Sequence, residues 1–84
     1  MKFLVIPAYE PDEKLIKLLK EVSALNLFQI IVVNDGSGEK FNNIFNAAKE
    51  YAILLSHGIN KGKGAALKTA FTYIKNLNTN GIIV

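Results

Sequence analysis

The sequence contains neither cysteine nor arginine. Without cysteine, no disulfide framework and no thiolate metal site can form. All ten basic residues are lysines, and most alternate with acidic residues at helical spacing, so the net charge of +3 indicates solvated helix faces. Proteins that bind nucleic acids usually carry arginine, denser basic clusters and interleaved aromatic residues. We therefore expect no nucleic-acid partner.

Long apolar runs are also missing. The apolar segment from Phe3 to Ile6 is ended after four residues by Pro7. A membrane-spanning helix needs about 20 apolar residues, and a secretory signal peptide needs a longer apolar core and a small-residue cleavage site. We expect neither, which is compatible with a cytoplasmic location. Half of the 84 residues are hydrophobic, so the chain is one folded domain rather than a disordered tail.

Short apolar segments alternate with amphipathic ones along the whole chain. Continuous apolar runs at 3–6, 30–33, 52–55 and 82–84 are typical of buried strands, and amphipathic stretches at about 12–24, 41–48 and 65–77 are typical of helices. The order β-α-β-α-β-α-β predicts an α/β fold, a three-layer Rossmann-like parallel sheet with right-handed crossovers. Residues 78–81 are expected to form the turn before the last strand.

The helical spacing also predicts which side chains face the sheet. The expected inward residues are Leu15, Leu18, Leu19 and Val22 in the first helix, Phe41, Ile44, Phe45 and Ala48 in the second, and Leu67, Ala70, Phe71 and Ile74 in the third.

In a sheet of this type, ligands bind at the carboxyl ends of the strands. The loops in that position are 7–12, 34–38 and 57–64. The glycines in these loops match neither the dinucleotide-binding fingerprint nor the Walker A pattern, whose first glycine is replaced by His57. Ser37, His57 and Asp35 do not have the spacing of a catalytic triad, and the strand-turn-helix serine motif of hydrolases is absent.

The third loop has the composition of an anion site. Lys61 and Lys63 flank Gly62 directly before a predicted helix N-terminus. Free backbone N–H groups and the helix dipole favour an anion there, and a glycine lets the backbone approach it. Taken alone, the same composition also fits a flexible, solvated loop.

Three segments, each at the end of a strand, together resemble the family 2 glycosyltransferases, which have the GT-A fold. They are Pro7-Ala8-Tyr9-Glu10, Val32-Val33-Asn34-Asp35-Gly36-Ser37 and His57-Gly58-Ile59-Asn60-Lys61-Gly62-Lys63-Gly64-Ala65-Ala66-Leu67. The resemblance covers essentially the whole chain. It implies that residues 1–84 form a truncated GT-A fold, the nucleotide-sugar-binding part of a longer protein.

The resemblance implies a role for each loop. The ring of Tyr9 would stack on the donor's base, and Asp35 would accept a hydrogen bond from the ring N–H of uracil, with guanine as the second possibility. The expected nucleotide-binding residues are Pro7, Ala8, Tyr9, Glu10, Asp35, Gly36 and Ser37, and the expected diphosphate-binding residues are Asn60, Lys61, Gly62 and Lys63. Ser37 is also expected to cap the second helix.

The resemblance further implies a divalent metal, Mg²⁺ or Mn²⁺, held in the parent enzyme by an acidic motif after the fourth strand. The sequence stops at Val84, before the place of that motif. We therefore predict no catalytic or metal-binding residue in these 84 residues, which alone should be inactive. The parent would transfer a sugar from a nucleotide-diphosphate sugar to a lipid phosphate or a saccharide, at the cytoplasmic face of a membrane.

Two other functions remain open from the residues. A non-catalytic module that binds a nucleotide or a partner would have the same fold, with the edge of its sheet available for association. A nucleotidyltransferase shares the layered α/β plan, but such enzymes carry a glycine-rich basic loop after the first strand, where this chain has Pro7-Ala8-Tyr9-Glu10.

Overall fold

The computed structural model describes residues 2–77 and 82–83 of the chain. The elements are β1 (Lys2–Ala8), α1 (Glu13–Leu25), β2 (Gln29–Asp35), the short 3₁₀ helix η1 (Glu39–Phe41), α2 (Asn42–Ala48), β3 (Ile53–His57), α3 (Lys63–Asn76) and β4 (Ile82–Ile83). The predicted alternation of strands and helices is confirmed. The predicted turn at 78–81 and the last residue of the predicted fourth strand lie outside the described residues.

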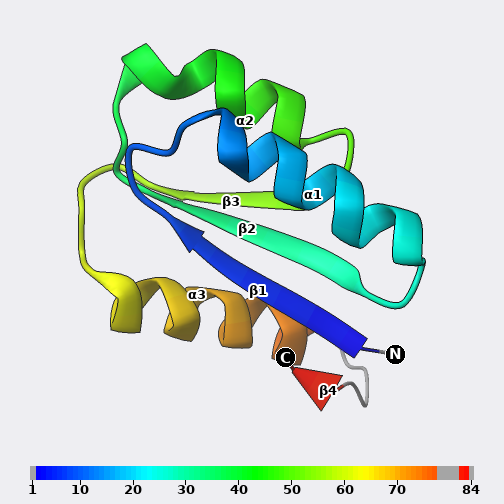
Figure 1. Cartoon of the computed structure of the whole chain (residues 1–84). Helices are drawn as coiled ribbons and strands as arrows, with labels where there is room; N and C mark the ends of the chain where they lie inside the picture. The colour runs from blue at the N-terminus through cyan, green and yellow to red at the C-terminus, as the bar shows by residue number, and fades with distance from the viewer. Residues whose placement is uncertain (1, 78–81, 84) are drawn as a thin grey trace.

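The strands form one parallel sheet in the order β3-β2-β1-β4. The chain therefore moves outward from β1 to β3 and then crosses back over β1 to reach β4. Because consecutive crossovers keep the same hand, a reversal of direction places the next helix on the opposite face of the sheet. Figure 1 shows this arrangement, with α1 and α2 covering one face and α3 covering the other.

The buried residues of β2 divide the core into two layers. Ile30 and Val32 face the layer of α1 and α2, whereas Ile31 and Val33 face α3, and all four are at most 2% exposed. This alternation explains why the strand reads as a continuous β-branched run: both of its faces are covered. A strand covered on both faces holds its last residue, Asp35, in a fixed position.

Two of the predicted core positions are wrong. Leu18 is 43% exposed, and the inward face of α1 is built from Leu15 and Leu19 with Ile16 and Val22 packed beside them. Phe71 is 45% exposed.

The sheet-facing row of α3 consists of Ala66, Ala70 and Ile74, spaced four residues apart. Phe71 follows Ala70 by one residue, which turns it about 100° away from that row. The predicted inward positions Ala70 and Ile74 are confirmed, and Ala66, which the spacing did not single out, is fully buried beside them. In both helices the apolar stripe in the sequence is broader than the face that meets the sheet.

Both ends of α1 are closed by local hydrogen bonds. The side chain of Asp12 accepts a hydrogen bond from the backbone N–H of Lys14, and Asn26 ends the helix in the left-handed conformation. These signals fix the first helix at Glu13, one residue later than predicted. Among residues 2–77 and 82–83, no helix is both long and apolar enough to cross a membrane.

Candidate functional site

The loops that follow β1, β2 and β3 meet at one edge of the sheet, as the sequence predicted. They enclose a cavity of about 370 Å³. Its lining consists of Pro7, Ala8, Tyr9, Asp35, Asn60, Gly62 and Lys63. All seven are among the residues that the sequence singled out. The other predicted site residues, Glu10, Gly36, Ser37 and Lys61, belong to the same loops but do not line this cavity.

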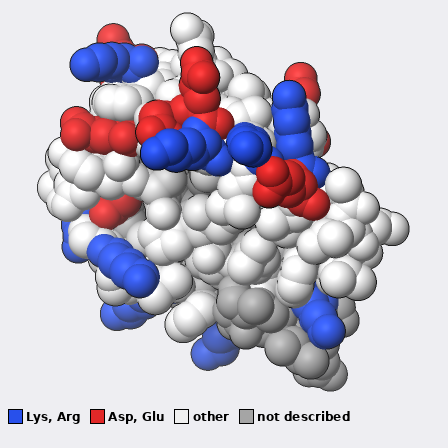
Figure 2. All heavy atoms as spheres, in the orientation of Figure 1, with Lys and Arg blue, Asp and Glu red and all other residues white. Residues whose placement is uncertain are grey.

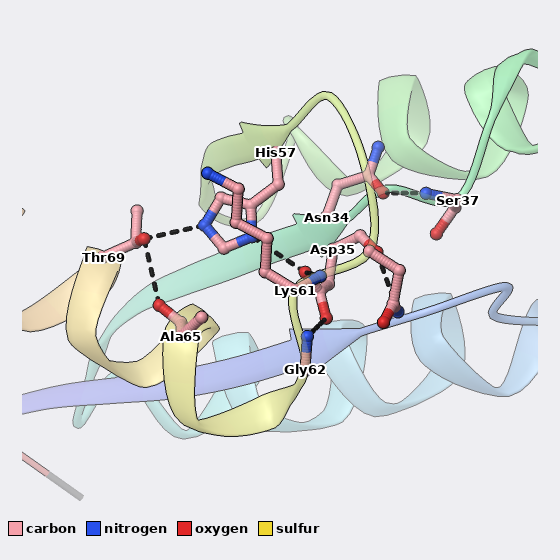
Figure 3. Close-up of polar contacts among 9 residues, drawn as sticks. Asn34, Asp35, Ser37, His57, Lys61, Gly62, Ala65 and Thr69 are labelled. Carbon is pink, nitrogen blue, oxygen red and sulfur yellow. Dashed lines mark hydrogen bonds and ion pairs between the residues drawn. The ribbon is translucent and has the colours of Figure 1, made fainter.

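The carboxylate of Asp35 is the centre of the site, because it connects the second loop to the third. Its Oδ1 atom accepts a hydrogen bond from the backbone N–H of Lys61 at 2.9 Å, and its Oδ2 atom accepts one from Gly62 at 2.8 Å. The Nδ1 atom of His57 lies 2.8 Å from Oδ1, and Asn60 donates from its side chain to the backbone carbonyl of Asp35 at 3.2 Å. Figure 3 shows these contacts.

These hydrogen bonds hold the pKa of Asp35 below its ordinary value of 3.8. The backbone N–H of Lys61 is the largest cause, and the hydrogen bond from His57 is the next. Burial acts in the opposite direction, since it disfavours the charged form, but the donors outweigh it, with the N–H of Gly62 and the charge of His57 adding to them. The cavity therefore has an ionised carboxylate in its wall at neutral pH.

Two residues outside the predicted site join this network, His57 and Thr69. The sequence indicated that His57 is a loop or strand-end residue rather than a catalyst, and its place at the end of β3 agrees with that. It is the last residue of β3 and pairs in register with Asp35, and only 7% of its side chain is exposed. Its Nε2 atom lies 2.7 Å from the hydroxyl of Thr69 on α3. The sequence ended the third strand at residue 55, before His57, and nothing in it indicated Thr69.

Ser37 joins the first loop to the second. Its hydroxyl accepts a hydrogen bond from the backbone N–H of Glu10 at 2.9 Å, and its own N–H donates to the side chain of Asn34 at 3.0 Å. The prediction that Ser37 caps the second helix is wrong. Gly38 and Phe41 occupy the cap positions of η1 and α2, and neither helix has a side-chain cap. The serine is instead 6% exposed and holds Glu10, whose φ is 49°.

The start of α3 lies at the cavity, so the positive end of the helix dipole is directed toward it. The helix begins at Lys63, two residues earlier than predicted, and no described side chain caps it. The first N–H groups of an α-helix have no acceptor within the helix, and lysine at this end adds positive charge where the helix dipole is already positive. Asp35 already accepts from the N–H groups of Lys61 and Gly62 just before the helix, and an anion in the cavity would find further N–H donors in the first turn.

The surface charges differ between the two helical layers that cover the sheet. Figure 2 shows acidic and basic side chains intermixed over α1 and α2. By contrast, α3 carries Lys63, Lys68 and Lys75 and no acidic residue. Within the described part of the chain, no group of three His, Cys, Asp or Glu side chains lies close enough to hold a metal ion. The resemblance places the divalent metal on a motif after the fourth strand of the parent enzyme rather than on these residues.

Comparison with known proteins finds similarity at the level of the family. The sequence model of the family described as "Glycosyl transferase family 2" matches residues 3–76. The chain is 36% identical to a dolichyl-phosphate beta-glucosyltransferase of Trichomonas vaginalis, with 86% of the chain and 26% of the relative covered. It is 37% identical to an uncharacterized protein of Methanocaldococcus jannaschii, with 80% of the chain and 27% of that protein covered. No solved structure matches significantly. The chain thus spans about a quarter of the length of these relatives.

The close approach between the second and third loops predicts a strong requirement for glycine at position 36. Gly36 has a φ of 73°, and a Cβ atom there would overlap the backbone of Ile59 and Asn60. Gly38 has a φ of 82° but open space around it. We expect Gly38→Ala to lower the free energy of unfolding by about 1–3 kcal/mol through the backbone conformation alone. Gly36→Ala should cost about 1–3 kcal/mol more, through overpacking.

Urea unfolding of the two variants measures this difference. Equal losses for Gly36→Ala and Gly38→Ala would contradict the close approach of the two loops.

The lowered pKa of Asp35 predicts how its contribution to stability depends on pH. A carboxyl group whose pKa is depressed in the folded state stabilises the fold fully above its unfolded pKa. That contribution is lost as the pH falls through the folded pKa, which lies below 3.8. We expect the wild type to exceed Asp35→Asn in free energy of unfolding by a constant amount near neutral pH. The gap should shrink below pH 3.8 in a series of urea titrations, and a gap that persists unchanged at lower pH would contradict the assignment.

Proposed function

Because the chain belongs to glycosyl transferase family 2, we propose that these residues bind the nucleotide-diphosphate sugar that serves as the donor of the whole enzyme. The observation that carries the proposal is the cavity at the carboxyl ends of the strands. It combines a flat aromatic ring, a buried carboxylate and the positive end of a helix. These three features correspond to the base, its ring N–H and the diphosphate.

Tyr9 is the proposed platform for the base. It follows β1 directly, lines the cavity and is 53% exposed. Exposure of a large aromatic ring to water is unfavourable, and a base stacked on it would cover that surface. Ala8, which is buried beside it in the lining, leaves room for the ligand. Stacking of a base on an aromatic side chain contributes about 1–3 kcal/mol at comparable sites.

Asp35 is the proposed acceptor for the ring N–H of the base. An ionised carboxylate has about four lone-pair positions, and the three hydrogen bonds to Lys61, Gly62 and His57 leave one of them, on Oδ2. Uracil N3–H and guanine N1–H can donate to it, whereas N3 of cytosine carries no hydrogen. A UDP-sugar is therefore the favoured donor and a GDP-sugar the second candidate.

The diphosphate would lie at the start of α3. Lys63 lines the cavity, and the uncapped N–H groups of the helix supply neutral donors beside its ammonium group. Lys61 and Asn60 are already ordered by their hydrogen bonds to Asp35. A bound diphosphate would thus meet a loop that needs little further ordering, which lowers the entropic cost of binding.

The proposal for the whole enzyme is transfer of the sugar to a lipid phosphate or a saccharide. The lipid phosphate is favoured because the Trichomonas relative is named a dolichyl-phosphate beta-glucosyltransferase. For the 84 residues alone we propose binding without turnover. A divalent metal belongs to the proposal for the whole enzyme, and no step is assigned to it because the described residues provide no ligand set.

Titration of the isotope-labelled chain with UDP tests the proposal. In two-dimensional amide NMR spectra, we expect the signals of Tyr9, Asp35 and Lys63 to shift on addition of UDP. GDP is the comparison ligand, and CMP is the negative control. Tyr9→Ala should weaken UDP binding about tenfold through loss of stacking. Phe71→Ala is the matched control, since Phe71 is also an exposed aromatic residue but lies outside the cavity lining.

Two results would contradict the proposal. One is a well-dispersed spectrum that no nucleotide changes. The other is an equal loss of affinity in Tyr9→Ala and Phe71→Ala.

A further inference from the structure

Outside the predicted site, the imidazole of His57 has a hydrogen-bond partner at each of its two ring nitrogens. Its Nδ1 atom lies 2.8 Å from Oδ1 of Asp35, and its Nε2 atom lies 2.7 Å from the hydroxyl of Thr69. The hydroxyl also lies 3.0 Å from the carbonyl oxygen of Ala65, one turn earlier on α3. His57 is not among the residues that line the cavity. Figure 3 shows the ring between the strand ends and α3.

The direction of one of these hydrogen bonds is fixed by chemistry. An ionised carboxylate only accepts hydrogen bonds, so Nδ1 of His57 must carry the hydrogen. Nε2 then either accepts from the hydroxyl of Thr69 or donates to it. In both cases the ring is held at its two nitrogen atoms, by β2 on one side and by α3 on the other.

The contact with His57 determines which lone pair of Asp35 remains for a ligand. Both positions of Oδ1 are taken by the N–H groups of His57 and Lys61, whereas Oδ2 accepts only from Gly62 and keeps one position. Without His57, Oδ1 would have an open position and the carboxylate would lose one of the donors that set its rotation. A buried acceptor without its donor is costly, so the group would reorient or recruit water.

We propose that His57, held by Thr69, is a positioning residue for base selection: it orders the Asp35 carboxylate so that one lone pair of Oδ2 faces the cavity and accepts the ring N–H of the base. This inference rests on the proposed function, because it assumes that a nucleotide occupies the cavity. It goes beyond that function by assigning the preference between bases to a residue outside the cavity lining.

The test compares UDP with CDP, which share the diphosphate and differ in the hydrogen on N3. Their dissociation constants are measured by calorimetry for the wild-type chain and its variants. We expect the wild type to bind UDP at least about tenfold more tightly than CDP, as one charge-assisted hydrogen bond allows. His57→Leu should lose most of this preference, mainly by weakening UDP, while its affinity for CDP changes little.

Two further variants separate positioning from general structural damage. His57→Asn places an amide N–H near the position of Nδ1 and should restore most of the preference for UDP. Thr69→Val keeps the shape of the side chain but removes the hydroxyl, and should reduce the preference about threefold. Lys63→Ala is the control, because loss of a phosphate contact should weaken UDP and CDP by the same factor.

The outcomes distinguish the inference from the function on which it rests. If the wild type prefers UDP and His57→Leu either keeps the preference or weakens both nucleotides equally, the inference is overturned and the proposed function stands. If the wild type binds UDP and CDP equally, base selection by Asp35 fails while diphosphate binding remains. If the wild type binds neither nucleotide, the proposed function fails and the inference fails with it. If His57→Leu does not fold, His57→Asn and Thr69→Val test the inference in its place. An unchanged preference for UDP in Thr69→Val then overturns the inference.

Discussion

The site depends on one buried carboxylate that accepts backbone hydrogen bonds from a loop remote in the sequence. Asp35 accepts hydrogen bonds from the backbone N–H groups of Lys61 and Gly62, which lie 26 and 27 residues further along the chain. Hydrogen bonds to a charged acceptor are stronger than neutral ones, and here they lie at the edge of a rigid sheet. Without this acceptor the third loop would lose two of the hydrogen bonds that hold it beside the end of β2.

The fold places the residues for this contact at one edge. The reversal of strand order after β3 sends α3 to the opposite face of the sheet, so its N-terminus approaches the ends of β1 and β2. Gly36 permits the close passage of the third loop, and Ser37 ties the first loop to the second. The cavity is thus bounded by three loops that share hydrogen bonds, which is the kind of pre-ordered site that binds with a smaller entropic cost.

The strand and helix order followed from the sequence because apolar runs and amphipathic periodicity are local signals. The cavity-lining residues were also predictable, since parallel strands bring their carboxyl ends together. The exposure of Leu18 and Phe71 was not, because the width of the buried face depends on how closely each helix packs. The roles of Ser37 and His57 depend on hydrogen bonds between distant segments, which no single-segment pattern contains.

The most direct test of this account is detection of the hydrogen bonds between the third loop and Asp35 themselves. In a uniformly labelled chain, NMR can measure scalar coupling across a hydrogen bond from an amide nitrogen to a carboxylate carbon. We predict such couplings from the amides of Lys61 and Gly62 to Cγ of Asp35, together with slow exchange of both amide hydrogens. Absence of both couplings, with amide exchange as fast as in an open loop, would contradict the claim that Asp35 holds the site together.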